Sequence, residues 1–204
     1  MSNTIAGLIL AGGLSRRMGG EKPLKPLAGQ PMIKRVINRI APQVERLAIN
    51  TNSDPAPYLE YGLPVLPDTI GGHLGPLAGV LTGMEWAAGL PGVTHLVSVA
   101  TDTPFLPRDL VSRFSALSGP ERIVLARSNG NRHPVVGLWP VALRCDLAEW
   151  LASSETMKVQ VWAARHELVF CDFEPEHDGA PDPFFNANTP EELAEAEAFL
   201  GRFD

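Results

Sequence analysis

Short apolar runs alternate with segments of helical spacing along the whole chain. The apolar runs are bounded by turn residues and predict strands over 4–10, 46–50, 65–66, 94–99, 123–126, 135–139 and 168–170. Helical patterns occupy 77–88 and 106–117, and a further helix through residue 40 opens at Pro31. This alternation is typical of an α/β fold with a parallel or mixed sheet.

The last thirty residues follow a different pattern. Residues 174–183 form a polar, proline-rich stretch that predicts a loop. Thr189 then precedes Pro190, Glu191 and Glu192, which is the sequence of a capped helix start with acids in its first turn. No repeat interrupts the chain, so we expect residues 1–204 to form a single domain. No apolar run approaches the ~20 residues that span a bilayer, so we expect no membrane segment.

The charge of the chain is unevenly distributed. There are 17 Lys and Arg residues against 23 Asp and Glu residues, a net charge of −6. Residues 11–40 nevertheless contain seven bases and the single acid Glu21; the bases are Arg16, Arg17, Lys22, Lys25, Lys34, Arg35 and Arg39. Nucleic-acid binding favours a broad basic face, which an acidic protein lacks. The pattern therefore indicates a small, highly charged anion as ligand.

Cysteine is rare in this sequence. Only Cys145 and Cys171 are present, without a C-x-x-C motif. This excludes a disulfide framework and a structural zinc site, and it favours a reducing cytoplasm.

The loop after the first strand carries the clearest chemistry. Residues 10–22 contain two glycine pairs together with Arg16, Arg17 and Lys22. Glycines let backbone N–H groups approach an anion, and the bases add charge-assisted donors, although a flexible turn with solvated bases is the alternative. The stretch does not fit G-x-x-x-x-G-K-[ST], and the chain has no G-x-G. These absences exclude a P-loop NTPase and a dinucleotide-dependent dehydrogenase.

The same loop carries a family resemblance. The run Leu10-Ala11-Gly12-Gly13, followed by Ser15, Arg17-Met18-Gly19 and Lys22, resembles the signature of the molybdenum cofactor guanylyltransferases, which are nucleotidyltransferases of GT-A type. Further motifs recur in the order of that family, so the resemblance covers nearly the whole chain; they are Gly75-Pro76-Leu77-Ala78-Gly79, Asp102-Thr103-Pro104, Arg132-His133-Pro134 and Asn186-Ala187-Asn188-Thr189-Pro190.

The resemblance implies a fold and a reaction. The fold is a Rossmann-like three-layer sandwich with a mostly parallel sheet. The reaction transfers GMP from GTP to the terminal phosphate of molybdopterin and releases pyrophosphate. The implied catalytic residues are Arg17, Lys22 and Asp102, and the implied GTP-binding residues are Leu10, Ala11, Gly12, Gly13, Arg16, Lys22, Asn50, Asp68, Gly79 and Asp102.

The position of Asp102 in the sequence makes it a candidate metal ligand independently of the resemblance. It follows an apolar run and therefore lies at the carboxyl end of a predicted central strand, where open α/β sheets bind ligands. A carboxylate there suits Mg²⁺, which binds through one or two protein ligands plus phosphate oxygens. The resemblance assigns Mg²⁺ to this aspartate. The alternative is an N-cap for a helix beginning near Pro104.

Asn50 and Asp68 follow the second and third predicted strands. Either side chain offers an acceptor for the N–H groups of guanine, and the sequence does not decide between them; the alternative is a local turn role. The neighbouring glycine-rich loop contains His73, which we expect to be solvent-exposed and not a catalytic base. Lys25 leaves the phosphate-contacting lysine ambiguous, and we choose Lys22.

The resemblance places the pterin half of the site in the C-terminal half of the chain and GTP in the N-terminal half. The implied pterin-binding residues are Arg132, His133, Asn186 and Asn188. The alternatives are a plain hairpin turn at 132–134 and helix capping by Asn188 or Thr189.

Three rival functions stay open. A cytidylyltransferase would use CTP with the same acceptor, and a related enzyme would use a sugar phosphate; Gly12-Gly13 favours the guanylyl branch, because the cytidylyl branch commonly has Ala-Ala-Gly. A non-catalytic nucleotide-binding scaffold is the third. The resemblance further implies contacts with proteins that insert molybdenum and with the enzymes that accept the finished cofactor.

Overall fold

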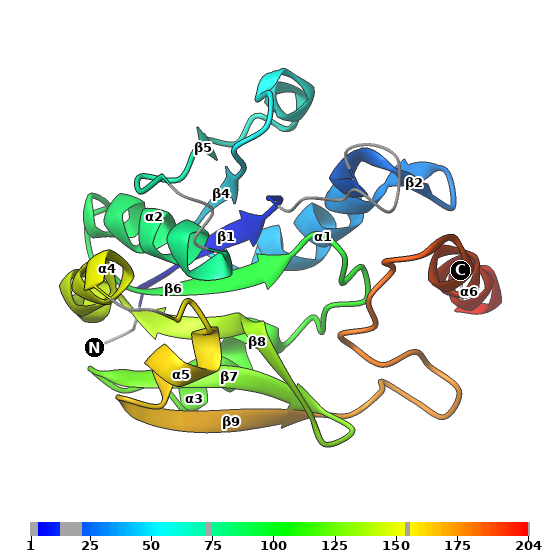
Figure 1. The fold of residues 1–204 in the computed structure, drawn as a ribbon. Helices are drawn as coiled ribbons and strands as arrows, with labels where there is room; N and C mark the ends of the chain where they lie inside the picture. Colours follow the sequence, from blue (N-terminus) through cyan, green and yellow to red (C-terminus); the bar gives the residue numbers. More distant parts are fainter. Residues whose placement is uncertain (1–3, 13–21, 72–74, 154–155, 204) are drawn as a thin grey trace.

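A seven-stranded sheet runs through the molecule in the order β5-β4-β1-β6-β8-β7-β9 (Figure 1). The computed structural model describes residues 4–12, 22–71, 75–153 and 156–203. The strands are β1 (Thr4–Leu10), β4 (Arg46–Asn50), β5 (Val65–Leu66), β6 (Val93–Ala100), β7 (Arg122–Ser128), β8 (Asn131–Pro140) and β9 (Glu167–Phe173). All pairings are parallel except those of β8, which is antiparallel to β6 and to β7. The expected mostly parallel α/β sheet is confirmed.

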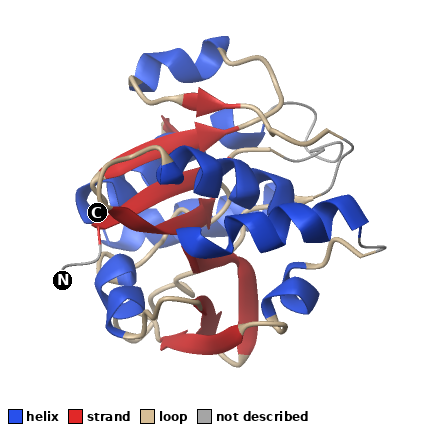
Figure 2. Cartoon of the chain, turned by 90° about the vertical axis from the view of Figure 1, so that its left-hand side faces the viewer, coloured by secondary structure: helices blue, strands red, loops and turns tan. Residues whose placement is uncertain are grey.

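Helices cover both faces of this sheet and make three layers (Figure 2). One face carries α1 (Met32–Ile40) and α3 (Leu110–Ala116). The other carries α2 (Pro76–Ala88), α4 (Arg144–Ser153) and α5 (Val159–Ala163). Strand β1 shows how the sequence produces this layering. Its side chains enter two separate cores, one on each face of the sheet, so nearly every position of the strand is apolar.

A third, smaller core joins a short hairpin to the C-terminal helix. The hairpin of β2 (Pro26–Leu27) and β3 (Gln30–Pro31) packs against the C-terminal helix α6 (Pro190–Phe203). The core contains Leu27 of the hairpin and Ala196 of α6, and its other buried residues are Met32, Phe105 and Ala187. The N–H of Ala28, in the hairpin turn, donates to Glu197 Oε1 at 3.0 Å. Short 3₁₀ helices complete the chain: η1 (Lys22–Leu24), η2 (Ala41–Gln43), η3 (Ala56–Tyr61) and η4 (Val141–Leu143).

The predicted strands are confirmed, with longer ends for most of them, but some boundaries were wrong. The helix expected over 106–117 begins only at Leu110, because Pro107 disfavours helical geometry in the residue before it. No helix begins near Pro104, so the N-cap alternative for Asp102 is wrong. Pro31 precedes α1 as its N-cap and pairs with Pro26 in the small hairpin.

The hairpin-turn alternative for residues 132–134 is also wrong. The turn between β7 and β8 consists of Asn129 and Gly130, both with positive φ angles of 48° and 76°. Arg132 and His133 instead belong to β8 and pair with β7. Helices α4 and α5 were not among the predicted elements.

Cys145 and Cys171 are both free thiols, the first exposed and the second buried. None of the described helices combines the length and apolar character needed to cross a bilayer.

Candidate active site

The carboxyl ends of four neighbouring strands meet at one edge of the sheet. This is the edge toward which β1, β6 and β9 point in Figure 1. Leu10 is the register partner of both Asn50 and Ala100, so the three strands end level with one another. Backbone hydrogen bonds continue beyond the strands. The N–H of Ala11 donates to the Asn50 carbonyl at 2.8 Å, and the N–H of Thr101 donates to the Leu10 carbonyl at 3.4 Å. The residues predicted for GTP in this region therefore share one edge, as open α/β folds require.

Asn50 and Asp68 form a hydrogen-bonded network with a third residue. Asn50 Nδ2 donates to the Leu66 carbonyl at 3.0 Å and to Asp68 Oδ1 at 2.8 Å. Asn52 Nδ2 donates to Asp68 Oδ2 at 2.7 Å, and Asn52 Oδ1 accepts the Asp68 N–H at 2.8 Å. Both Asn50 amide protons are thus used within the protein, whereas a carboxylate retains further acceptor capacity. The network holds Asp68 in one orientation.

Gly79 allows α2 to lie directly against these strand ends. A Cβ atom at this position would stand 2.3 Å from Asn50 Oδ1 and 2.7 Å from Leu10 Cδ2. Asn50 itself is only 4% exposed, so its amide has little room to move. The structure therefore gives Gly79 a packing role that keeps the amide in place.

Asp102 lies two residues beyond the end of β6 and is partly buried. The turn that carries it is tied by Thr103 Oγ1, which donates to the Ala100 carbonyl at 2.9 Å. The Asp102 carbonyl accepts the N–H of Ala187 at 3.1 Å, which brings the segment between Asn186 and Asn188 to this edge. Within the described part of the chain, no three His, Cys, Asp or Glu residues cluster as a ready-made metal site. A cation at Asp102 would need ligands from phosphates or water.

The segment between Asn186 and Asn188 is anchored at its far end by a capping box. Thr189 Oγ1 accepts the Glu192 N–H at 3.1 Å, and Glu192 Oε2 accepts the N–H groups of Thr189 at 2.9 Å and Asn188 at 2.7 Å. Thr189 therefore supplies the capping side chain of α6. The side chains of Asn186 and Asn188 are exposed, and the backbone between them bonds to the turn that carries Asp102.

Arg132 and His133 lie on opposite faces of the sheet, because neighbouring residues of a strand alternate. The Arg132 guanidinium stacks 4.8 Å from the ring centre of Phe170, which packs against the core below α4 and α5. The His133 ring lies 4.6 Å from that of Phe184, in the other core. The structure thus brings His133 to the segment that leads to Asn186 and Asn188, and it places Arg132 on the other face.

Several predicted residues lie outside the described part of the chain. They are Gly13, Arg16, Arg17 and His73, and the side chain of Lys22 joins them, although its backbone opens η1.

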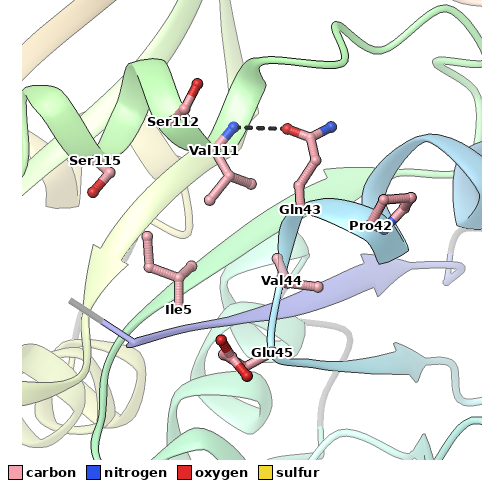
Figure 3. A pocket seen from close by; sticks show the side chains of 8 residues that line it. All are labelled: Ile5, Pro42, Gln43, Val44, Glu45, Val111, Ser112 and Ser115. Atoms are coloured by element: carbon pink, nitrogen blue, oxygen red, sulfur yellow. Dashed lines mark hydrogen bonds between the residues drawn. The ribbon is translucent and has the colours of Figure 1, made fainter. Parts of the chain in front are cut away.

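A cavity of about 300 Å³ lies at the opposite edge of the sheet, between η2 and α3 (Figure 3). It lies beside Ile5, near the start of β1, and Glu45, just before β4. Gln43 Oε1 accepts the Val111 N–H there at 3.0 Å. None of the residues predicted for the site lines it, so it is separate from the edge described above.

Sequence reasoning missed three polar residues at the edge formed by the carboxyl ends of the strands: Asn52, Ser128 and Asp182. Asn52 holds Asp68, and Asp182 accepts hydrogen bonds from Ser128 and from the Phe184 N–H, each at 2.8 Å. The sequence signal was weak, since all three read as ordinary turn or strand-end residues. Their partners are distant along the chain, and only the fold brings them together.

Known proteins resemble this chain over nearly its whole length. The sequence matches the MobA-like NTP transferase domain over residues 7–168. A molybdenum cofactor guanylyltransferase of Bradyrhizobium sp. (strain ORS 278) is 48% identical, with 100% of this chain and 96% of the relative covered. A protein of the same name from Rhizobium meliloti (strain 1021) is 47% identical, with 95% and 90% covered.

Solved structures support the same fold. The molybdopterin-guanine dinucleotide biosynthesis protein A of Archaeoglobus fulgidus superposes with a TM-score of 0.76 at 20% identity, covering 97% of this chain and 100% of its own. A nucleotidyl transferase from Methanothermobacter thermautotroptrophicus reaches 0.74 at 14% identity, with 100% of both chains covered. With relatives at 48% and 47% identity over almost the full length and the domain match over 7–168, the chain belongs to the molybdenum cofactor guanylyltransferase family of nucleotidyltransferases.

Proposed function

We propose that this chain transfers GMP from GTP to the terminal phosphate of molybdopterin, forming the guanine dinucleotide cofactor and pyrophosphate. One observation carries the proposal: residues far apart in the sequence, Asn50, Asp68, Asp102 and the segment around Ala187, share one edge of the sheet. Two substrates must be aligned for this reaction, and that edge joins groups from both halves of the chain. Family membership supports the same chemistry.

In this proposal Asp68, and not Asn50, reads the guanine base. Asn50 donates both amide protons within the protein, to the Leu66 carbonyl and to Asp68 Oδ1, and its oxygen faces Gly79. The Asp68 carboxylate accepts one bond on each oxygen from the protein and keeps acceptor capacity for the two kinds of N–H on the guanine pairing edge. Asn50 and Asn52 then act as supports that aim the carboxylate.

The triphosphate would bind at the loop that leaves β1. Arg16, Arg17 and Lys22 supply its positive charge, and Leu10 and Ala11 fix where the loop begins. The attacking group is already an anionic phosphate at neutral pH, so the protein needs no base, and the proposed transfer is direct, without a covalent enzyme intermediate. Its contribution is to screen phosphate repulsion and to align the attack in line with the leaving pyrophosphate.

Asp102 would hold a divalent cation, which we propose to be Mg²⁺. The single carboxylate fits this ion, because Mg²⁺ commonly binds through one or two carboxylates and takes its other ligands from water and substrate phosphates. When bound, the ion neutralises charge that develops on the phosphate oxygens. The Asp102 carbonyl is already engaged by Ala187, which fixes the turn that presents the side chain.

The pterin would lie toward the C-terminal half, against His133 and the exposed side chains of Asn186 and Asn188. Arg132 lies on the other face of the sheet and would therefore contact a different part of the substrate from His133. We also propose that proteins which insert molybdenum, and the enzymes that receive the product, approach the protein during this step.

Pyrophosphate release with purified molybdopterin and each of the four nucleoside triphosphates tests the function. We expect turnover with GTP and Mg²⁺ and a loss of about 10²–10³ in kcat for Asp102→Asn. Asp172→Asn changes another aspartate, which is exposed on β9, and should keep full activity. Turnover with CTP instead of GTP would replace the proposal by the cytidylyl alternative. GTP binding without pyrophosphate release would indicate a scaffold.

Inosine triphosphate, which lacks the guanine amino group, tests the base contact. The wild type should prefer GTP over this analogue by roughly tenfold, the value of about one hydrogen bond. Asp68→Asn should weaken GTP binding and reduce that preference, as measured by calorimetry. An unchanged preference in this variant would show that another residue reads the base.

A further inference from the structure

Two side chains of the β7–β8 hairpin and one from the loop after β9 form a short hydrogen-bonded relay. Ser128 Oγ lies 2.7 Å from His133 Nε2 and 2.8 Å from both carboxylate oxygens of Asp182. Asp182 also accepts from Asn129 Nδ2 and from the Phe184 N–H, each at 2.8 Å. Ser128 is 1% exposed, whereas His133 is only partly buried.

The donors around Asp182 determine the direction of the relay. Asn129 Nδ2 and the backbone N–H of Phe184 can only donate, so both Asp182 oxygens act as acceptors. Ser128 has one proton, and it donates that proton to the carboxylate. Its oxygen must then accept from His133, which places a proton on Nε2.

The remaining nitrogen of His133 is left as the acceptor. Within the described residues, Nδ1 has no hydrogen-bond partner. Burial lowers the pKa of His133 below its ordinary value, although the Asp182 charge opposes this change, so the ring is neutral at neutral pH. A neutral ring with Nε2–H carries a lone pair on Nδ1.

The relay is not arranged for nucleophilic catalysis, although it contains Ser, His and Asp. In a hydrolytic triad the histidine stands between the other two, takes the serine proton and is itself oriented by the aspartate. Here the serine stands between, its proton goes to Asp182, and it is buried. The serine therefore connects the other two residues and does not attack a substrate.

We propose that Ser128 and Asp182 are positioning residues that hold His133 with its proton on Nε2, so that Nδ1 accepts a hydrogen bond from an N–H donor of the pterin substrate. The proposal rests on the proposed function, which supplies a pterin, and pterin rings carry N–H donors. Asp182 also begins the segment that carries Asn186, whose neighbour Ala187 bonds to Asp102. The relay thus links the histidine to the turn that presents the metal-site candidate.

The first test is the protonation state of His133, observed by ¹⁵N NMR of the whole protein without substrate. We expect the wild type at pH 7 to show a protonated Nε2 and an unprotonated Nδ1. Asp182→Asn removes the charge and puts an N–H donor beside Ser128 Oγ, so the Nδ1–H form should gain population. A wild-type ring that is doubly protonated or protonated on Nδ1 would overturn the proposal, and so would a variant spectrum identical to the wild type.

The second test separates binding of the two substrates. Asp182→Asn and Ser128→Ala should each raise the KM for molybdopterin by about tenfold, the value of one hydrogen bond, while the KM for GTP and kcat stay within about twofold. Ser98→Ala is the matched control, because Ser98 is another buried strand serine with two partners, the Val135 carbonyl and Trp139 Nε1. It should leave both KM values unchanged. If Asp182→Asn does not fold, Ser128→Ala still decides, since Asp182 then keeps its other bonds.

The outcomes distinguish this proposal from the proposed function. A wild type that transfers no guanylyl group, with the expected NMR spectrum, refutes the function and leaves the relay established without its pterin role. Normal transfer with an unchanged molybdopterin KM in both variants refutes the role of His133 and leaves the function intact.

Discussion

Replacement of Gly79 by alanine tests whether α2 holds the nucleotide network in place. The new Cβ would stand 2.3 Å from Asn50 Oδ1, whereas real Cβ atoms essentially never approach closer than 3.0 Å. The buried amide of Asn50 must therefore retreat by about 0.7 Å or rotate. Rotation breaks its bonds to the Leu66 carbonyl and to Asp68.

The magnitude follows from three contributions. Two lost hydrogen bonds cost about 1 kcal/mol each, and overpacking costs about 1–3 kcal/mol. Alanine in a helix interior stabilises the folded state by about 1 kcal/mol relative to glycine. We therefore expect Gly79→Ala to lower the free energy of unfolding by about 2–4 kcal/mol. GTP affinity should fall about tenfold, because Asp68 loses the Asn50 bond that orients it.

Gly83→Ala is the matched control, one helical turn further along α2. Its Cβ would stand 2.6 Å from Leu8 Cδ2 and 2.7 Å from Leu96 Cδ2, so it strains the core without touching the network. Urea unfolding should show a loss of stability for both variants, and calorimetry should show weaker GTP binding only for Gly79→Ala. Equal GTP binding by the two variants, or wild-type stability of Gly79→Ala, would refute the reasoning. In an Asn50→Ala background the cost of Gly79→Ala should shrink, because the colliding amide is gone.

Three further predictions concern stability. Thr189→Ala removes the cap of α6 and should cost about 1 kcal/mol in urea unfolding; no loss would show that the capping box does not hold the helix start. Burial lowers the pKa of His95, against its bond to the Gly119 carbonyl, so the unfolded chain binds a proton more readily and stability should fall as the pH drops below about 6.5. His95→Gln should flatten that slope between pH 5 and 8, and an unchanged slope would contradict this cause. Although burial alone would raise it, hydrogen bonds from Trp162 and His166 lower the pKa of Asp146. Asp146→Asn should therefore lose stability at pH 7, with a difference from wild type that shrinks as the pH falls toward 4 and below and that unfolding curves at each pH can measure.

The order of elements was largely predictable, because each parallel strand buries both of its faces and so forms a continuous apolar run. Strands β1, β4 and β5 begin and end at the predicted residues. The helix α3 was predicted too early, since proline-containing turns and helix starts share a similar composition. Helix α4 lacks a clear amphipathic pattern and contains only two buried residues, and α5 is only five residues long.

The candidate site was predictable where a residue directly follows a strand. The positions of Leu10, Asn50 and Asp102 follow from the rule that the carboxyl ends of parallel strands share one edge. The rule does not give side-chain partners. It left Asn50 and Asp68 equivalent, whereas the hydrogen bonds distinguish a support from a candidate acceptor.

The sequence by itself determined the class of fold, the basic loop after the first strand and the family to which the chain is similar, because these depend on local composition and on short motifs. Only the tertiary structure decided that Arg132 and His133 face opposite cores, that Gly79 touches Asn50, and that Asp182 meets Ser128 across 54 residues of chain. These relations depend on strand register and helix packing. Both are set by the burial of the whole core, and no single segment carries that information.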